Sequence, residues 1–261
     1  MNAPPDRTIP IIACIALLLT LALAVMAIAP VSVTGCQGAR ASDDASSVPD
    51  HLEQTTLLLT APDAADRIPY RERGFSDEVE ASIAWWMAPD FYDTTSEYRG
   101  YLRGTTDEQA EYAEEKQVFY TFITENLDDA INASKLHSDL LLFRGISPGL
   151  AGMVIDHAEY TDAAFASTSY DITLSLGLFA SPDETGYANV LILKRHAGDH
   201  ALYINEDERE YLQPRDSAWY VARTVEVEDL TVESDFPLIV NNRTSASFEG
   251  VRLIYIVEED G

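Results

Sequence analysis

Cysteine and basic residues are scarce in this chain, and both shortages limit what it can do. Only two cysteines, Cys14 and Cys36, occur among its 261 residues, so the region after residue 36 has neither a disulfide framework nor a cysteine-ligated metal site. Lys and Arg number 17 against 44 Asp and Glu, which gives a formal net charge of -27. Such a charge repels phosphate backbones, and we expect no nucleic-acid partner. An Arg inside an apolar run of so acidic a chain is expected to have a specific role.

Two common kinds of cofactor motif are also missing. No Gly-x-Gly-x-x-Gly follows any predicted strand, so a dinucleotide would not be held in the manner of a Rossmann fold. The histidines are scattered without the spacing of metal ligands, and we expect no metal site. They are His51, His137, His157, His196 and His200.

The first 36 residues have the pattern of an export signal. A short polar start with Arg7 precedes an apolar run, IPIIACIALLLTLALAVMAIAP, which is long enough to enter a bilayer. The sequence Val33-Thr34-Gly35-Cys36 follows, resembles a bacterial lipobox, and predicts cleavage before Cys36 and a lipid attached to it. An uncleaved signal anchor is the alternative, because the start has only one positive charge. We expect an exported protein held at the outer face of the cell membrane or, as a further alternative, secreted.

The segment after this signal has little to bury. Residues 37–75 begin with small and polar residues and predict a linker that holds the domain formed by residues 76–261 away from the membrane. Only the run LLLTAP at 57–62 is apolar enough for a short docking strand.

From residue 76 the pattern is that of an α+β domain. Ser76 is an expected N-cap for a helix over SDEVEASIAWWM, and Thr105 with Glu108 fits a capping box for a long helix over 105–134. Phe119, Ile123, Leu127 and Ile131 recur every fourth residue of that helix, with Phe122 beside them, and predict a core-facing stripe. Strands are then predicted at short intervals, in DLLLFRG, AAFASTSYD, ANVLILK, REYLQP, AWYVARTVEV and VRLIYIVEE. Helices followed by strands indicate helices packed on mostly antiparallel sheets.

Arg144 ends the apolar run LLLFRG, where a buried strand meets a turn at Gly145. Burying an unpaired guanidinium costs several kcal/mol, so Arg144 is expected to meet either an internal carboxylate or an anionic ligand. Gly145 favours the ligand, because a residue without Cβ lets a ligand approach the backbone closely.

Hydroxyls and carboxylates follow on two later strands. Ser167 and Ser169 should point to one face of their strand and Thr168 to the other, where hydroxyls either tie sheet edges together or hold a ligand. If REYLQP is a strand and the residues just before it are its entry loop, Glu208 and Glu210 should share a face, with Cα atoms about 7 Å apart. Like charges so close are a poor choice for stability, which favours a site, although an acidic solvated loop is the plain alternative.

In this order, LLFRG, FASTS and EREYLQPRDS resemble the Arg, Ser-Thr-Ser and Glu-x-Glu signature of mono-ADP-ribosyltransferases, particularly the bacterial exoenzymes that include binary-toxin components. The resemblance covers about residues 76–258, and EYRGYLRG is similar to the Leu-Arg-Gly segment of that family. It implies an ADP-ribosyltransferase-like fold, with helices packed on two mostly antiparallel sheets around an NAD cleft. The chain departs from many relatives in having Arg99-Gly100 where they have an Asn before the Leu-Arg.

The resemblance also implies roles for the matching residues. Arg144 would contact the NAD diphosphate, with the Gly145 backbone near the nicotinamide amide. Ser167 would hold the nicotinamide ribose, while Thr168 and Ser169 brace the sheet. Glu210 would bond the ribose 2′-OH and face the positive charge that develops as nicotinamide leaves. Glu208 would orient a protein acceptor, most often an arginine in this family, and residues 204–207 would form the acceptor-recognition turn.

The expected function is therefore transfer of ADP-ribose from NAD to a protein arginine, without a metal. An NAD glycohydrolase, in which water replaces the protein, and a non-catalytic surface lipoprotein that retains the fold are the alternatives. A glycoside hydrolase also uses paired carboxylates, but it needs them on separate elements that flank the scissile bond.

Overall fold

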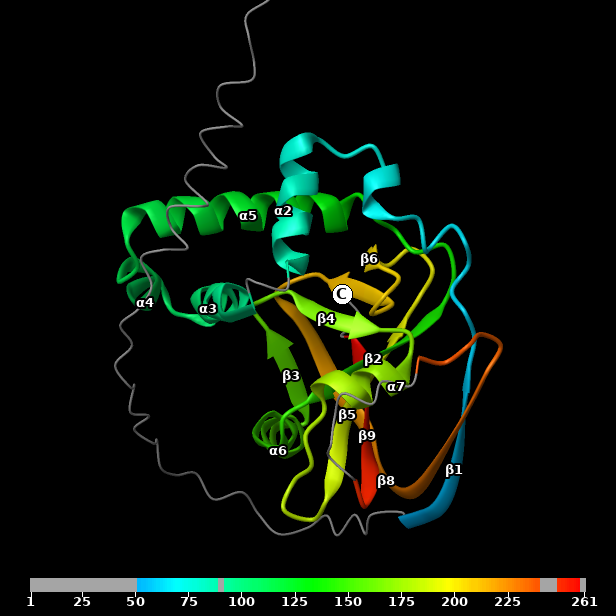
Figure 1. Cartoon of the computed structure of the whole chain (residues 1–261). Coiled ribbons are helices and arrows are strands. Elements are labelled where there is room, and N and C mark those ends of the chain that lie inside the picture. The colour runs from blue at the N-terminus through cyan, green and yellow to red at the C-terminus, as the bar shows by residue number, and fades with distance from the viewer. Residues whose placement is uncertain (1–50, 89–91, 240–247, 259–261) are drawn as a thin grey trace, which may run out of the picture. The chain divides into compact units, whose positions relative to one another are not determined.

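The computed structural model describes residues 51–88, 92–239 and 248–258, and within them nine strands form one mixed sheet (Figure 1). The strands are β1 (His51–Leu59), β2 (Leu140–Ile146), β3 (Glu159–Asp162), β4 (Ala166–Ser169), β5 (Tyr187–Arg195), β6 (Leu202–Asn205), β7 (Glu210–Gln213), β8 (Ser217–Ser234) and β9 (Gly250–Glu258). Their order is β1-β8-β9-β5-β2-β4-β7-β6, and β3 pairs with β8 outside this path. The pairs β1–β8 and β5–β9 are parallel and the others antiparallel.

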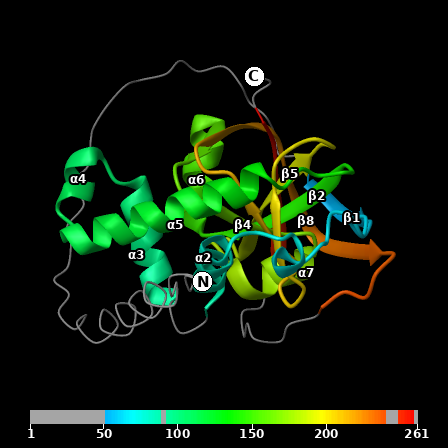
Figure 2. The ribbon, with the colours of Figure 1, turned by 90° about the horizontal axis from the view of Figure 1, so that it is seen from above.

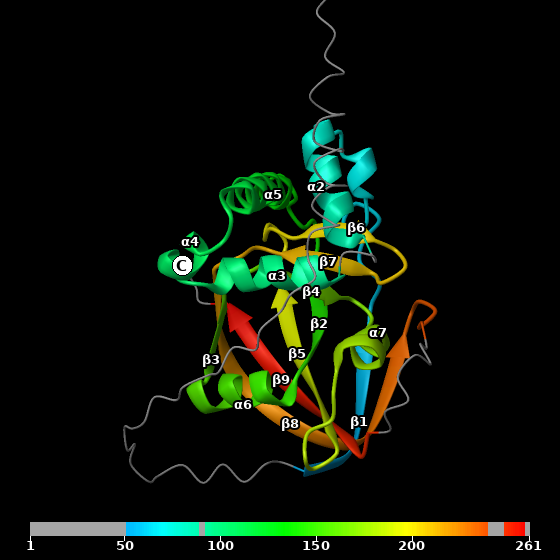
Figure 3. The ribbon, with the colours of Figure 1, turned by 60° about the vertical axis from the view of Figure 1, so that its left-hand side comes forward.

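The sheet has two parts that meet at one point. β2 and β4 share a single register pair, Phe143 with Ser169, between the larger part that ends in β2 and the smaller part β4-β7-β6. In Figures 1 and 3, β4 and β7 run crosswise to β5 and β9. The expected α+β class is thus confirmed, and the two predicted sheets are joined into one because this single pair connects them.

Helices cover both parts of the sheet. They are η1 (Tyr70–Glu72), α2 (Asp77–Met87), α3 (Tyr92–Arg103), α4 (Thr106–Ala110), α5 (Glu114–Asn132), α6 (Pro148–His157), α7 (Ile172–Leu174) and the short π-helical turn η3 (Ser175–Phe179). Seen from above, α2 and α5 lie over β4 (Figure 2), whereas α6 packs near β3 in the larger part (Figure 3). The smaller part of the sheet is therefore covered by α2 and α5, which both belong to the first half of the domain.

The long helix predicted over 105–134 is divided into α4 and α5. The capping box is present, with Glu108 N donating to Thr105 Oγ1 (3.3 Å) and Thr105 N to Glu108 Oε2 (2.7 Å), but it starts the short α4. In α5, the predicted stripe is buried at Ile123, Leu127 and Ile131, whereas Phe119 is half-buried and Phe122 is exposed. The cap that begins α2 is also as predicted, because Val79 N donates to Ser76 Oγ.

Residues 51–75 belong to the folded domain, which corrects the predicted linker over 37–75. β1 pairs along its length with β8, and its Leu57 and Leu59 are buried in the core. Downstream, the buried carboxylate of Asp66 accepts hydrogen bonds from His137 N (2.6 Å) and Ser138 Oγ (2.6 Å). The sequence of this segment resembles that of a linker because the residues it packs against, those of β8 and residues 137–138, are distant along the chain.

The predicted signal, the lipobox with Cys36 and the start of the linker lie outside the described residues. Within residues 51–88, 92–239 and 248–258, no helix has the length and hydrophobicity needed to span a bilayer.

Candidate functional site

A cavity of about 530 Å³ lies where the two parts of the sheet meet. Its walls come from the end of α2, from α3, β2, β4 and η3, and from the turn that leads into β7. All the residues predicted as catalytic or NAD-binding line it, namely Arg144, Gly145, Ser167, Thr168, Ser169, Glu208 and Glu210. The fold thus brings together side chains from three separate stretches of the sequence.

Glu210 is the first residue of β7 and is buried. It pairs in register with Ser169 of β4, which fixes its Cα at the floor of the cavity. Asn205 Nδ2 donates to Glu210 Oε2 (3.0 Å), and Trp86 Nε1 lies 3.5 Å from Oε1. Two neutral donors therefore orient this carboxylate without neutralising its negative charge.

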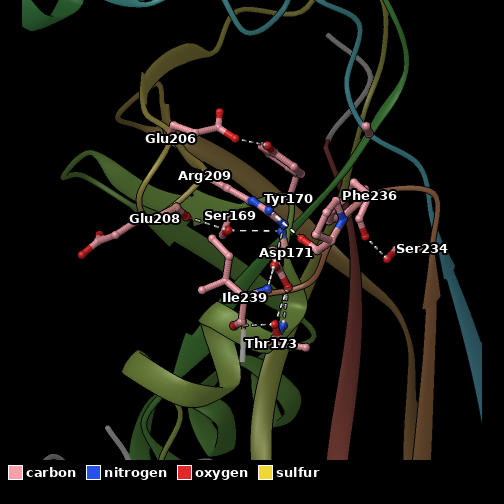
Figure 4. Close-up of polar contacts among 12 residues, drawn as sticks. Ser169, Tyr170, Asp171, Thr173, Glu206, Glu208, Arg209, Ser234, Phe236 and Ile239 are labelled. Carbon is pink, nitrogen blue, oxygen red and sulfur yellow. Dashed lines mark hydrogen bonds and ion pairs between the residues drawn. The ribbon is translucent and has the colours of Figure 1, made fainter. Parts of the chain in front are cut away.

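Glu208 lies in the turn 206–209 that enters β7, so the alternation of an extended strand, on which the expected shared face was based, does not hold for it. Arg209, between them, has a left-handed backbone (φ 50°), which breaks the alternation of an extended chain. The half-buried Glu208 still lines the cavity, because its N–H donates to Asn205 Oδ1 (2.7 Å) and its carbonyl accepts from Ser169 Oγ (2.8 Å; Figure 4). Asn205 consequently contacts both acidic residues.

Arg144 projects from β2 toward β4. Its Nη1 donates to the carbonyl of Ser167 (3.2 Å), and its Nη2 lies 3.8 Å from Asp162 Oδ2. The main partner of that carboxylate is Arg103, which binds both oxygens at 2.8 Å. Burial favours a higher pKa for Asp162, but the hydrogen bonds and charge of Arg103 hold the pKa below its usual value. The internal ion pair expected for Arg144 is therefore long, and Arg144 shares Asp162 with Arg103. Arg144 also lines the cavity, so a role in binding an anionic ligand is compatible with its position.

Gly145 is required by the packing of the protein itself. A Cβ at this position would lie 2.3 Å from the carbonyl oxygen of Ser175 and 2.6 Å from the backbone nitrogen of Ala180. The space that was expected to admit a ligand to the Gly145 backbone on the Cβ side is therefore filled by η3 and the residue that follows it.

The three hydroxyls of β4 have different partners. Ser167 Oγ accepts from Arg99 Nη2 (3.2 Å) and lies beside the cations of the cavity. Thr168 is buried, donates to the carbonyl of Tyr211 (2.9 Å) and accepts from Gln213 Nε2 (3.0 Å). Thr168 and Ser169 therefore connect β4 to β7 and to the turn before it, the bracing geometry that the resemblance implied.

Other residues also line the cavity, and the sequence patterns did not single out Trp86, Arg99 or Phe179 among them as site residues. Asn205 and Asp207, which also line it, lie in the turn 204–207 that the resemblance implied for acceptor recognition. The Arg99 guanidinium lies over the Trp86 ring, 4.5 Å from its centroid. A signal for Arg99 existed, because it stands where many relatives of the resembled family have an Asn. Trp86 was assigned to an ordinary amphipathic helix, and nothing in the sequence separated Phe179 from a core residue.

Two arginines and two acidic residues line the cavity along β4. Arg99 and Arg144 both donate to Ser167, whereas Glu210 pairs in register with Ser169 and the backbone carbonyl of Glu208 accepts from Ser169 Oγ. Trp86 contacts both kinds of charge, because the Arg99 guanidinium lies over its ring and its Nε1 lies 3.5 Å from Glu210 Oε1. The cavity therefore holds cations and carboxylates close to one another. Within the described residues, no group of three or more His, Cys, Asp or Glu is placed to hold a metal ion.

Solved structures of toxin enzymes resemble this chain. Plx2a, an ADP-ribosyltransferase toxin from Paenibacillus larvae, is 16% identical with a TM-score of 0.50, and the match covers 73% of this chain and 90% of that one. C2-I, the enzymatic component of the C2 toxin from Clostridium botulinum, is 15% identical with a TM-score of 0.50, covering 73% of this chain and 44% of C2-I. The C3 exoenzyme from Clostridium limosum is 15% identical with a TM-score of 0.46, covering 74% of this chain and 89% of that one. No protein-family model and no curated protein matches the sequence.

Proposed function

We propose that this chain, which shares the fold of bacterial mono-ADP-ribosyltransferase toxins, transfers ADP-ribose from NAD to an acceptor and releases nicotinamide. The observation that supports this most strongly is that one cavity is lined by two arginines, Arg99 and Arg144, and by two glutamates, Glu208 and Glu210. NAD carries an anionic diphosphate and a cationic nicotinamide ring, so each of its charged groups would meet an opposite charge in this cavity.

The two guanidiniums would bind the diphosphate. A guanidinium offers a planar fork of donors that matches phosphate oxygens, and charge-assisted hydrogen bonds of this kind are stronger than neutral ones. Ser167, between the two guanidiniums, would hold the ribose attached to nicotinamide. The Phe179 side chain is 47% exposed at the cavity wall and offers a face for stacking an aromatic ring. The backbone of Gly145 would face the nicotinamide amide.

Glu210 would stabilise the reacting carbon. As the bond between ribose C1 and the nicotinamide nitrogen breaks, both electrons leave with nicotinamide, which becomes neutral and needs no general acid. Positive charge builds up on the ribose, and the fixed carboxylate of Glu210 would stabilise it. Removing one preorganised electrostatic group of this type lowers a rate by about 10²–10³.

Glu208 would act on the acceptor. It is half-buried, more accessible than Glu210, and lies in a turn with the exposed residues Glu206 and Asp207. An arginine acceptor is cationic and therefore attracted to this turn, and it must lose a proton as its nitrogen bonds to C1, which a carboxylate can assist. Water could take the place of arginine, in which case the protein would be an NAD glycohydrolase.

The proposal is tested by incubating the purified protein with NAD labelled in the ADP-ribose part, alone, with polyarginine and with polylysine. Free nicotinamide and labelled polymer are both measured. A transferase to arginine labels polyarginine and not polylysine, whereas a glycohydrolase releases nicotinamide without labelling either. If the protein releases no nicotinamide under any condition, it is a non-catalytic protein that retains the fold.

We also propose that the protein is exported and anchored by a lipid on Cys36, on the basis of the lipobox resemblance alone. Replacing Cys36 by Ser should move the protein out of the membrane fraction, and an unchanged distribution would contradict a lipid anchor.

A further inference from the structure

The residue between the two glutamates points away from the cavity. Figure 4 shows Glu208 and Arg209 extending in opposite directions, with the Arg209 side chain directed toward Tyr170, Asp171 and Phe236. Arg209 is buried and is not among the residues that line the cavity. Lys and Arg are few in this chain, so a buried arginine next to the proposed catalytic residues is expected to have a specific role.

Arg209 is held by an ion pair, a hydrogen bond to a backbone carbonyl and two aromatic rings. Its Nη1 donates to Asp171 Oδ2 (2.8 Å), its Nη2 donates to the carbonyl of Pro237 (2.6 Å), and the guanidinium lies over the rings of Tyr170 (5.4 Å) and Phe236 (4.9 Å). The side chains of Arg209 and Asp171 are 8% and 0% exposed. An ion pair so deeply buried is fixed in one geometry, since neither partner can turn to water.

Asp171 connects the turn to two other segments. Its Oδ1 accepts from Thr173 N (2.9 Å), and its Oδ2 also accepts from Ile239 N (2.9 Å; Figure 4). Thr173 lies in α7, which leads directly into η3 and the cavity wall at Phe179. The Asp171 carboxylate therefore connects three segments, namely the turn with the glutamates, the helical segment that leads to the cavity wall at Phe179, and the segment after β8.

The backbone of Arg209 needs this support. Its φ of 50° lies in the left-handed region, which is uncommon for a residue with a Cβ and persists where surrounding contacts impose it. Both backbone groups of Arg209 are also bonded, N to the carbonyl of Glu206 and O to the N–H of Tyr170. In this conformation the buried Arg209 side chain points away from the cavity, and its neighbours Glu208 and Glu210 both line the cavity.

We infer that Arg209 and Asp171 are a positioning pair for the proposed reaction: their buried ion pair holds the left-handed turn that presents Glu208 and Glu210 to the cavity. The inference rests on the proposed function for its catalytic meaning. Neither residue touches NAD in this account, so loss of the pair should affect the chemical step more than NAD binding.

The test compares Arg209→Met, Arg209→Lys and Asp171→Asn in the full chain, measuring kcat and KM for nicotinamide release. Because small misplacements of reacting groups cost up to about 10²-fold in rate, kcat of Arg209→Met should fall by about that factor while KM for NAD changes less than about 3-fold. Arg209→Lys keeps the charge and should recover part of the loss. The double variant of Arg209→Met and Asp171→Asn should be no slower than the slower single variant, because both remove one interaction.

A matched control separates positioning from stability. Arg195 is also buried and ion-paired, to Glu258 (2.6 Å), but it does not line the cavity. Arg195→Met should lower the thermal unfolding temperature without lowering kcat of the folded protein. If Arg209→Met behaves like Arg195→Met, or raises KM with kcat unchanged, the positioning role is refuted.

Amide hydrogen exchange supplies a readout that needs no NAD. Exchange in residues 206–210 should accelerate in Arg209→Met and Asp171→Asn but not in Arg195→Met, and equal exchange in all three would overturn the inference. If the wild-type protein releases no nicotinamide, the proposed function fails while the exchange experiment still decides whether this pair holds the turn.

Discussion

Replacing Arg99 by Gln should weaken NAD binding through the loss of one diphosphate contact. Arg99 has a hydrogen bond to Ser167 (3.2 Å) and a cation–π contact with Trp86, and the loss of these two contacts should lower the free energy of unfolding by about 1–2 kcal/mol. A hydrogen bond between charged partners contributes about 1.5–3 kcal/mol, and each ~1.4 kcal/mol is tenfold in affinity. The dissociation constant for NAD should therefore rise by about 10- to 100-fold.

Calorimetric titration can identify the contact that is lost. Nicotinamide riboside has the same ring and ribose as the reacting half of NAD but no diphosphate, so its affinity should be unchanged by Arg99→Gln. Arg223→Gln, which removes an equal charge from β8 at a residue outside the cavity, serves as the matched control and should leave NAD binding unchanged. The reasoning is refuted if riboside and NAD lose affinity equally, or if Arg223→Gln has the same effect as Arg99→Gln.

Three other changes have directions set by the structure. Gly145→Ala forces a Cβ against the backbone of η3 and Ala180, and such overpacking should lower the free energy of unfolding, measured by urea titration, by about 1–3 kcal/mol; an unchanged midpoint would contradict the close approach. Asp162 has a lowered pKa in the folded state, so the stability it contributes is present above about pH 4 and is lost as the pH falls below that value. Asp162→Asn should therefore lower the unfolding temperature more at pH 7 than at pH 3, and an equal loss at both would count against this. Glu208→Gln should reduce labelling of polyarginine more than it reduces NAD hydrolysis, and equal losses would remove its separate role.

The strands and the convergence of the site could be predicted because both depend on local patterns. Continuous apolar runs such as 140–143 and 190–193 form β2 and β5, and the run in β5 is buried on both faces, whereas Leu141 in β2 is exposed. The order of the motifs along the chain, through the family that it resembles, was enough to predict that Arg144, Ser167 and Glu210 would line one cavity, although they lie on three different strands.

The features that were missed depend on contacts between distant residues. β1 is a strand because β8, about 170 residues later, offers a parallel neighbour with a matching apolar face. The turn at Glu208 depends on the left-handed conformation of Arg209, which is held by Asp171 and by the segment after β8. The division of the long helix and the position of Arg99 over Trp86 likewise follow from packing and not from a local pattern.

The most direct measurement is the rate of nicotinamide release from NAD by Glu210→Gln beside the wild-type protein, with Glu228→Gln, an exposed residue of β8, as the matched control. Glutamine keeps the shape of Glu210 and can still accept from Asn205, so the unfolding temperature should change little. The account predicts a rate lower by about 10²–10³ in Glu210→Gln and an unchanged rate in Glu228→Gln. Release at the wild-type rate by folded Glu210→Gln would contradict it.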